Sequence, residues 1–122
     1  MLIEVMKPDF QFKNDSGILI QLVHDGWKQI NVITSIKGCV RGGHYHKFNK
    51  EAFYIISGSF DLDVWNREGV HEHYRFKSGD MFLINENVSH TFTYLDDSTL
   101  VAMYSNGVEL DENNKDIWSS YD

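Results

Sequence analysis

The feature of this sequence that most constrains its fold is a succession of short β-prone runs divided by turn residues. Branched aliphatic and aromatic residues dominate the runs, and glycine, asparagine, aspartate and serine separate them. No segment shows sustained helical periodicity. The runs that we interpret as strands are residues 18–24, 29–36, 51–57, 60–65, 70–76, 81–84, 90–95 and 100–105. About eight to ten strands at this spacing predict an all-β barrel or sandwich.

The chain is short enough to form one domain. Its 122 residues allow a single sizeable core, and the hydrophobic content of 42% argues against disorder. No linker, repeat or low-complexity segment divides it, so we predict one domain over residues 1–122. The polar, acidic tail from Asn106 onward departs from the strand pattern. We expect this tail to form a short helix near residues 116–118 or to wrap over the barrel.

Charge and cysteine content narrow the classes of function. The net charge of −7 argues against a nucleic-acid partner, because phosphate contacts need a basic surface. Cys39 is the only cysteine, so no disulfide can form within the chain and a reducing compartment is the simplest interpretation. The N-terminus lacks a basic, apolar leader, and no apolar run approaches the ~20 residues that span a bilayer. We therefore expect a cytoplasmic protein without a membrane partner.

The residues best suited to chemistry are three histidines and a glutamate. His44 and His46 lie two positions apart, so on an extended chain both imidazoles can point at one spot. Glu51 follows after a short turn and can bring a carboxylate back beside them. A third imidazole must come from elsewhere in a barrel, and His90 opens a later strand. Three nitrogens and one oxygen suit a divalent ion such as Zn, Fe, Mn, Ni or Cu, so we predict a metal site here.

The other histidines provide a comparison within the same sequence. His71 and His73 have the same spacing but no obvious partners, and we assign them to an exposed strand without a metal role. His24 stands alone at the end of a strand, and we expect it to be structural. Because an isolated pair of this kind is usually a surface feature, the spacing alone does not establish a metal site.

The residues around the first histidine pair are more specific. Gly38 is followed by five residues, then His44 and His46, four more residues, Glu51, six more residues and Gly58. This arrangement is the complete first motif of the cupin superfamily, which the chain therefore resembles. The resemblance implies a double-stranded β-helix, also called a jelly-roll barrel, with these histidines and this glutamate as metal ligands.

A second cupin motif is present in a weaker form. It begins at Gly79 and places its histidine at His90, which the resemblance makes the fourth ligand. Asn85 and Asn87 replace the proline and glycine of the motif, and Tyr94 replaces its final asparagine. The two motifs and the strands between them cover residues 38–94.

The segment VRGGHYHK at residues 40–47 narrows the choice among cupins. It is similar to the RGxHxH segment of cupins that modify nucleotide-linked sugars, such as dTDP-sugar 3,4-ketoisomerases and the cupin domains of capsular-polysaccharide reductase/epimerase proteins. This resemblance implies an isomerase or epimerase that acts on a dTDP- or UDP-linked keto-sugar in surface polysaccharide biosynthesis. It assigns His44 and His46 to catalysis on the sugar, and Arg41 to binding of a phosphate or the sugar.

The metal role and the acid–base role compete for the same histidines. The ketoisomerases commonly carry glutamine at the position of Glu51, whereas this chain has both Glu51 and His90. If a metal occupies all four ligands, the base must be another residue, such as Tyr54, Tyr104 or His24. We therefore count Tyr54 among the candidate catalytic residues and Tyr104 among the candidate substrate-binding residues.

Two other classes of function are compatible with the same residues. One is a metal-dependent dioxygenase or related small-molecule enzyme, in which an iron with open positions activates oxygen. The other is a cupin that binds a sugar or another ligand without catalysis. Small cupins often dimerise by exchanging an N-terminal segment, so we also expect a homodimer in which residues 1–12 pair with the partner chain.

Overall fold

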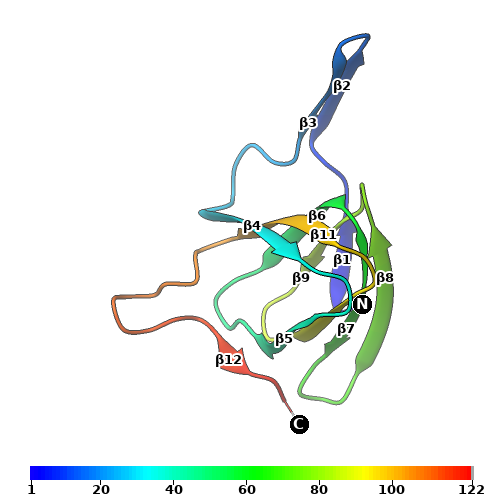
Figure 1. Ribbon diagram of the computed structural model, residues 1–122. Helices are drawn as coiled ribbons and strands as arrows, with labels where there is room; N and C mark the ends of the chain where they lie inside the picture. Colours follow the sequence, from blue (N-terminus) through cyan, green and yellow to red (C-terminus); the bar gives the residue numbers. More distant parts are fainter. Residues whose placement is uncertain (122) are drawn as a thin grey trace.

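The computed structural model describes residues 1–121 and shows two five-stranded antiparallel sheets that pack face to face (Figure 1). In the first sheet the order is β1-β9-β6-β11-β4, and in the second it is β12-β5-β10-β7-β8. The first sheet consists of β1 (Ile3–Met6), β4 (Gln29–Ser35), β6 (Glu51–Ser57), β9 (Met81–Ile84) and β11 (Ser98–Tyr104). The second sheet consists of β5 (Val40–Tyr45), β7 (Ser59–Trp65), β8 (His71–Lys77), β10 (Ser89–Tyr94) and β12 (Trp118–Ser119). The prediction of an all-β jelly roll is confirmed.

Strand β5 is the most consequential strand that the sequence patterns did not predict. Its first half is rich in glycine, which disfavours strands, and residues 40–45 are not among the runs that we interpreted as strands. Gly42 has a φ of +112°, and a Cβ there would lie 2.5 Å from the carbonyl oxygen of His90. Glycine is therefore required where β5 passes closest to β10, beside an irregularity in their pairing at His90 and Thr91.

The core between the sheets is dominated by aromatic rings. Alternation along β7 turns Phe60 and Leu62 inward, and both are fully buried. The rings of Phe76 and Phe82 stack with their centroids 4.3 Å apart, and the ring centroids of Phe60 and Phe92 are 4.9 Å apart. These rings fill part of the barrel interior, and the histidine-bearing strands line the space beside them.

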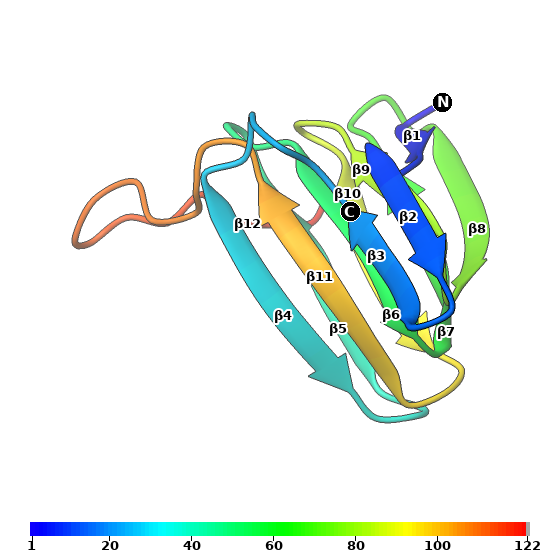
Figure 2. The ribbon, with the colours of Figure 1, turned by 90° about the horizontal axis from the view of Figure 1, so that it is seen from above.

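A hairpin of β2 (Phe10–Asn14) and β3 (Gly17–Gln21) projects from the outer side of the first sheet (Figure 1). Its strands run roughly along the sheet when the molecule is seen from above (Figure 2). Residues of both strands are exposed, including the apolar side chains of Phe10, Phe12, Ile18 and Leu19. The segment predicted to exchange, residues 1–12, is thus divided, because β1 pairs with β9 of its own chain.

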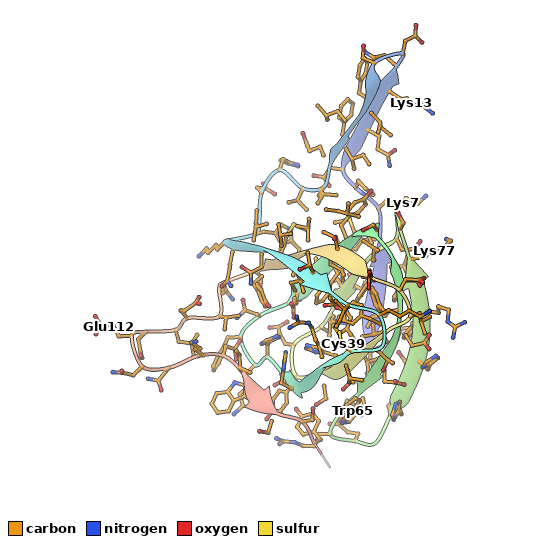
Figure 3. All side chains as sticks on the ribbon, viewed as in Figure 1. Lys7, Lys13, Cys39, Trp65, Lys77 and Glu112 are labelled. Atoms are coloured by element: carbon orange, nitrogen blue, oxygen red, sulfur yellow. The ribbon has the colours of Figure 1, made fainter. Side chains whose placement is uncertain are left out.

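The acidic tail leaves β11, extends away from the barrel and returns through β12 to pair with β5 (Figures 1 and 2). Glu112 lies at the outer end of this excursion (Figure 3). Residues 1–121 contain no helix, so the helix expected near residues 116–118 is absent, and the tail contacts the barrel again from Asp116 onward. Consistent with this, the described residues include no helix able to cross a membrane.

Candidate metal centre and adjoining cavity

Three strands bring the predicted ligands to one place inside the barrel. His44 lies near the end of β5 and is the register partner of His90 on β10, while His46 follows directly after β5. The ring centroid of His44 is 5.1 Å from that of His46 and 4.7 Å from that of His90. Each of the three imidazoles offers a nitrogen within 4.8 Å of the other two. Antiparallel pairing has therefore gathered side chains that are more than 40 positions apart in the sequence.

Glu51 adds a carboxylate to this cluster. It opens β6 and is only 3% exposed. Its Oε1 is 3.0 Å from Nε2 of His46 and 3.8 Å from Nε2 of His90. The structure thus brings the three predicted histidine ligands together and places Glu51 beside two of them, His46 and His90.

Main-chain carbonyls orient two of the imidazoles. Nδ1 of His46 donates to the carbonyl oxygen of Asp116 at 2.6 Å, and Nδ1 of His90 donates to that of Val88 at 3.2 Å. A carbonyl can only accept, so Nδ1 carries the hydrogen in both rings and Nε2 faces Glu51. Histidine ligands in metal proteins are commonly held in this way, and three nitrogens with one oxygen suit Zn, Fe, Mn or Ni. The residues present therefore fit a divalent metal.

The cluster separates neutral imidazoles from a charged pair. Burial lowers the pKa of His90 to about 4. Burial and the neighbouring His46 also lower the pKa of His44. Burial disfavours the charged form of His46 too, but its hydrogen bond with Glu51 and the charge of that carboxylate outweigh burial and raise the pKa of His46. The cluster therefore favours the protonated form at His46, beside Glu51, and the neutral form at His44 and His90.

A cavity of about 400 Å³ adjoins the cluster. Its lining is Ile33, Arg41, Gly42, His44, Glu51, Phe53, His90, Phe92, Tyr94 and Tyr104. His46 does not line the cavity and lies behind the other ligands, whereas His44 is half-buried at its wall. The cavity therefore exposes His44, Glu51 and His90, but not His46, between the aromatic side chains of its walls.

The cupin-domain family matches residues 32–105, which is more than half of the chain. The chain belongs to the cupin family. Among curated proteins none matches its sequence significantly.

Solved structures show which cupins this barrel resembles. QdtA, a sugar 3,4-ketoisomerase from Thermoanaerobacterium thermosaccharolyticum in complex with TDP, matches with a TM-score of 0.76 and 18% identity over 98% of this chain and 89% of that chain. The dTDP-4-dehydrorhamnose 3,5-epimerase from Sulfolobus tokodaii matches with a TM-score of 0.74 and 23% identity over 87% of this chain and 71% of that chain.

The capsular polysaccharide assembling protein CapF from Staphylococcus aureus is a third similar structure. It matches with a TM-score of 0.69 and 19% identity, over 93% of this chain and 34% of that chain. The cupin thus spans about one third of CapF. At these identities, all three likenesses establish a shared fold.

Arg41 lies at the boundary between the main cavity of this cupin and a second cavity of about 690 Å³. Its guanidinium donates to Oγ of Ser35 at 2.8 Å and to the carbonyl oxygen of Thr34 at 3.3 Å. Both residues lie at the C-terminal end of β4. No carboxylate lies within ion-pair distance of Arg41 among the described residues. Its charge is therefore held in place by neutral acceptors and is available to an anion.

The two predicted tyrosines differ in position. Tyr104 lines the cavity, and its ring lies edge-on to His46 at 5.5 Å. Burial and the negative charge of Glu51 raise the pKa of Tyr104, so its hydroxyl stays protonated and can donate a hydrogen bond. Tyr54 does not reach the cavity, because alternation along β6 directs it to the outer face of the sheet, where it packs against Ala52 and Met81. From this position Tyr54 cannot act as a base on a molecule in the cavity, contrary to our prediction.

The histidines outside the cluster have other partners. His71 and His73 lie on β8, where they contact the carboxylate of Asp63 at 3.5 Å and 3.1 Å. His24 is exposed, and its Nδ1 donates a hydrogen bond to the carboxylate of Asp9 at 2.6 Å. None of these three lines the cavity of this cupin.

Sequence reasoning missed two buried polar residues that support the site. Asp116 has no exposed surface, and Asn49 is 1% exposed. Asn49 donates from its side chain to Asp116 and to the carbonyl of Gly107, which ties the loop after β5 to the returning tail. The only signal for either residue was the expectation that the tail wraps over the barrel.

Proposed function

We propose that this cupin binds a divalent metal and isomerises or epimerises a nucleotide-linked keto-sugar. The observation that carries the proposal is a cluster of three imidazoles, with Glu51 beside two of them, next to a cavity whose lining includes Arg41 without a carboxylate partner. The folds of QdtA, the 3,5-epimerase and CapF are consistent with it. A place in surface polysaccharide biosynthesis is part of the proposal, supported by the same likenesses.

The chemistry follows from the residues around the cavity. Shifting a keto group, or inverting the carbon beside one, requires removal of a proton next to a carbonyl and stabilisation of the enediolate. His44, His46, Glu51 and His90 would hold the metal, which when bound would polarise the carbonyl and stabilise negative charge on oxygen. The protonated hydroxyl of Tyr104 donates a hydrogen bond to a sugar oxygen on the same side.

Substrate position depends on Arg41 and on the aromatic walls. A cavity of about 400 Å³ has room for a hexose but not for an entire nucleotide sugar, so the nucleotide extends past Arg41. The guanidinium is suited to the diphosphate by its forked donors. We expect Arg41→Ala to weaken dTDP binding about ten- to a hundredfold by calorimetry, since a charge-assisted hydrogen bond is lost. Arg67→Ala, at an exposed arginine that does not line the cavity, is the control.

The decisive measurement is metal content together with proton exchange. We expect about one divalent ion per chain after preparation without chelator, and loss of the ion in His46→Ala. With dTDP- or UDP-linked keto-sugars, the carbon next to the carbonyl should exchange its proton with solvent. Absence of exchange with all such sugars would contradict the enzymatic proposal and favour a ligand-binding cupin. Iron with substrate-dependent oxygen consumption would instead favour the dioxygenase class.

A metal-free variant of the reaction uses the same cavity. His44 is neutral and faces the bound molecule, so it can accept the proton when no metal occupies its nitrogen. If chelated protein still exchanges the sugar proton and His44→Gln does not, His44 is the base. If exchange requires the metal and fails equally in His90→Gln, the chemistry is centred on the metal.

We also propose a homodimer, built with the projecting hairpin. Phe12 and Leu19 are cross-strand neighbours in it, and both are more than half exposed. An uncovered two-stranded hairpin is marginally stable, and β4 is an edge strand that exposes Ile30 and Val32. We expect a dimer by sedimentation, and dissociation in Phe12→Asp. A wild-type monomer at micromolar concentration would refute the proposal.

A further inference from the structure

The carboxylate of Asp116 organises the turn that connects His46 to Glu51. Its Oδ1 accepts hydrogen bonds from the main-chain N–H of Lys47 at 2.8 Å and from Nε1 of Trp118 at 2.9 Å. Its Oδ2 accepts from the main-chain N–H of Phe48 and from Nδ2 of Asn49, both at 2.8 Å. All four acceptor positions of a carboxylate are thus used, and the side chain is completely buried.

The main chain of the same residue contacts the ligand cluster directly. The carbonyl oxygen of Asp116 accepts a hydrogen bond from Nδ1 of His46 at 2.6 Å. The N–H of Asp116 donates to the carbonyl of Val108 at 2.8 Å. One residue of the tail therefore holds the turn with its side chain and the imidazole with its main chain.

The tail is anchored on the far side of Asp116 as well. Trp118 pairs with Tyr45 in β5, and Nζ of Lys47 lies 3.7 Å above its ring. Tyr121 stacks on Tyr45 at 4.5 Å. The carbonyl that faces His46 is thus fixed by strand pairing and aromatic contacts on one side and by the N–H of Asp116 on the other.

We propose that Asp116 is a positioning residue that fixes the tautomer and orientation of His46. The carbonyl holds the Nδ1–H, which turns Nε2 towards Glu51 at 3.0 Å. The residue does not touch a bound sugar, since it does not line the cavity. The geometry stands without the reaction, but its use in holding a metal rests on the proposed function. The tail is in this sense part of the site, although it comes from the opposite end of the chain.

The test compares Asp116→Ala with Asp111→Ala. Asp111 lies in the same tail and accepts hydrogen bonds from Asn113 and Asn114, but it is exposed and does not contact the site. The first measurement is the imidazole nitrogen chemical shifts of His46, taken by NMR at a pH at which the ring is neutral. Wild type and Asp111→Ala should show a protonated Nδ1 and an unprotonated Nε2. Asp116→Ala should show a mixture of tautomers.

The second measurement is the affinity for Zn²⁺ alone, by competition with a chromophoric chelator. We expect binding to be about ten- to a hundredfold weaker in Asp116→Ala than in Asp111→Ala, as for other groups that orient metal-bound histidines. Asp116→Asn keeps the shape and one acceptor oxygen, so it should restore part of the wild-type tautomer population, and it serves if the alanine variant does not fold.

An unchanged Nδ1–H tautomer in folded Asp116→Ala or Asp116→Asn would overturn the proposal, whatever the Zn²⁺ affinity. Failure of wild-type protein to bind Zn²⁺ or to exchange sugar protons would instead count against the proposed function. The tautomer measurement needs neither metal nor sugar, so the two failures are distinguishable.

Discussion

Acidification is expected to destabilise the folded cupin through His90. Its imidazole is 2% exposed and lies 4.7 Å from the ring of His44 and 5.5 Å from that of His46. Burial lowers the pKa of His90 to about 4, whereas the same residue in the unfolded chain titrates near its ordinary value of 6.5. Between these values the unfolded chain binds a proton at this position and the folded chain does not.

This difference fixes both the sign and the size of the effect. Because the unfolded state binds more protons, the free energy of unfolding falls as the pH falls through this range. At about pH 5, roughly 1.5 pH units below the unfolded pKa, the loss is about 2 kcal/mol. His44, whose pKa is also lowered, adds to the loss. His46 has a raised pKa, so its contribution to stability grows as the pH falls through 6.5 and offsets part of the loss; this contribution is common to the wild type and to His90→Gln.

Urea unfolding of chelator-treated protein at about pH 7.5 and about pH 5 measures the effect. The wild type should lose about 2 kcal/mol more than His90→Gln between the same two pH values, because the contributions of His44 and His46 are common to both proteins. The comparison uses the difference within each protein, so any general destabilisation by the substitution cancels. An equal loss in both proteins would refute the assignment of the effect to a buried neutral His90.

Three further predictions concern the core, a turn and the metal. Phe60→Ala should lower the free energy of unfolding in urea by about 3–5 kcal/mol, because Phe60 is fully buried among aromatic rings. Ile56→Ala, at a half-exposed position, should lower it by less than about 1.5 kcal/mol. Similar losses in the two variants would contradict the core assignment. Gly58→Ala should lower the free energy of unfolding by more than about 2 kcal/mol, because φ is +92° and the new Cβ would overlap Oγ of Ser98 and lie 2.5 Å from the carbonyl oxygen of Asp97. Gly69 has a similar φ of +85° but open space around it, so Gly69→Ala should show only the cost of the backbone conformation, about 1 kcal/mol. Glu51→Gln should weaken Zn²⁺ binding at least about tenfold in a chelator competition, because an amide oxygen is a poorer ligand than a carboxylate, and unchanged affinity would remove Glu51 from the ligand set.

Hydrophobic alternation was the most reliable guide from sequence to structure. A period of two puts Glu51 and Phe53 on one face of residues 51–57, and both line the cavity. The same alternation assigns Tyr54 to the opposite face, so selecting Tyr54 for its chemistry conflicted with the pattern that had located its neighbours. The period of two follows from strand geometry and therefore outweighs the chemical suitability of a side chain.

The features that the sequence did not predict depend on main-chain contacts. β5 was not predicted because it contains two glycines, and residue preferences count glycine against a strand. Gly42 is nevertheless needed there, because the main chain passes close to that of His90. The contact between Asp116 and His46 spans 70 positions and uses a carbonyl group, which every residue possesses. The type of side chain at position 116 therefore does not predict this contact. The buried carboxylate of Asp116 instead explains how the carbonyl is held in place.

Glu51 explains why one cluster can serve both proton chemistry and metal binding. A proton held between Oε1 of Glu51 and Nε2 of His46 occupies the atoms that a divalent ion would use, so the ion must displace it. His44 and His90 are already neutral imidazoles at neutral pH, each with one nitrogen free to bind an ion, because burial lowers the pKa of both. Without an ion, the same arrangement leaves a neutral His44 on the cavity wall and a charged pair behind it. A glutamine at position 51 would weaken both states, since it can neither stabilise a protonated His46 nor offer an anionic ligand.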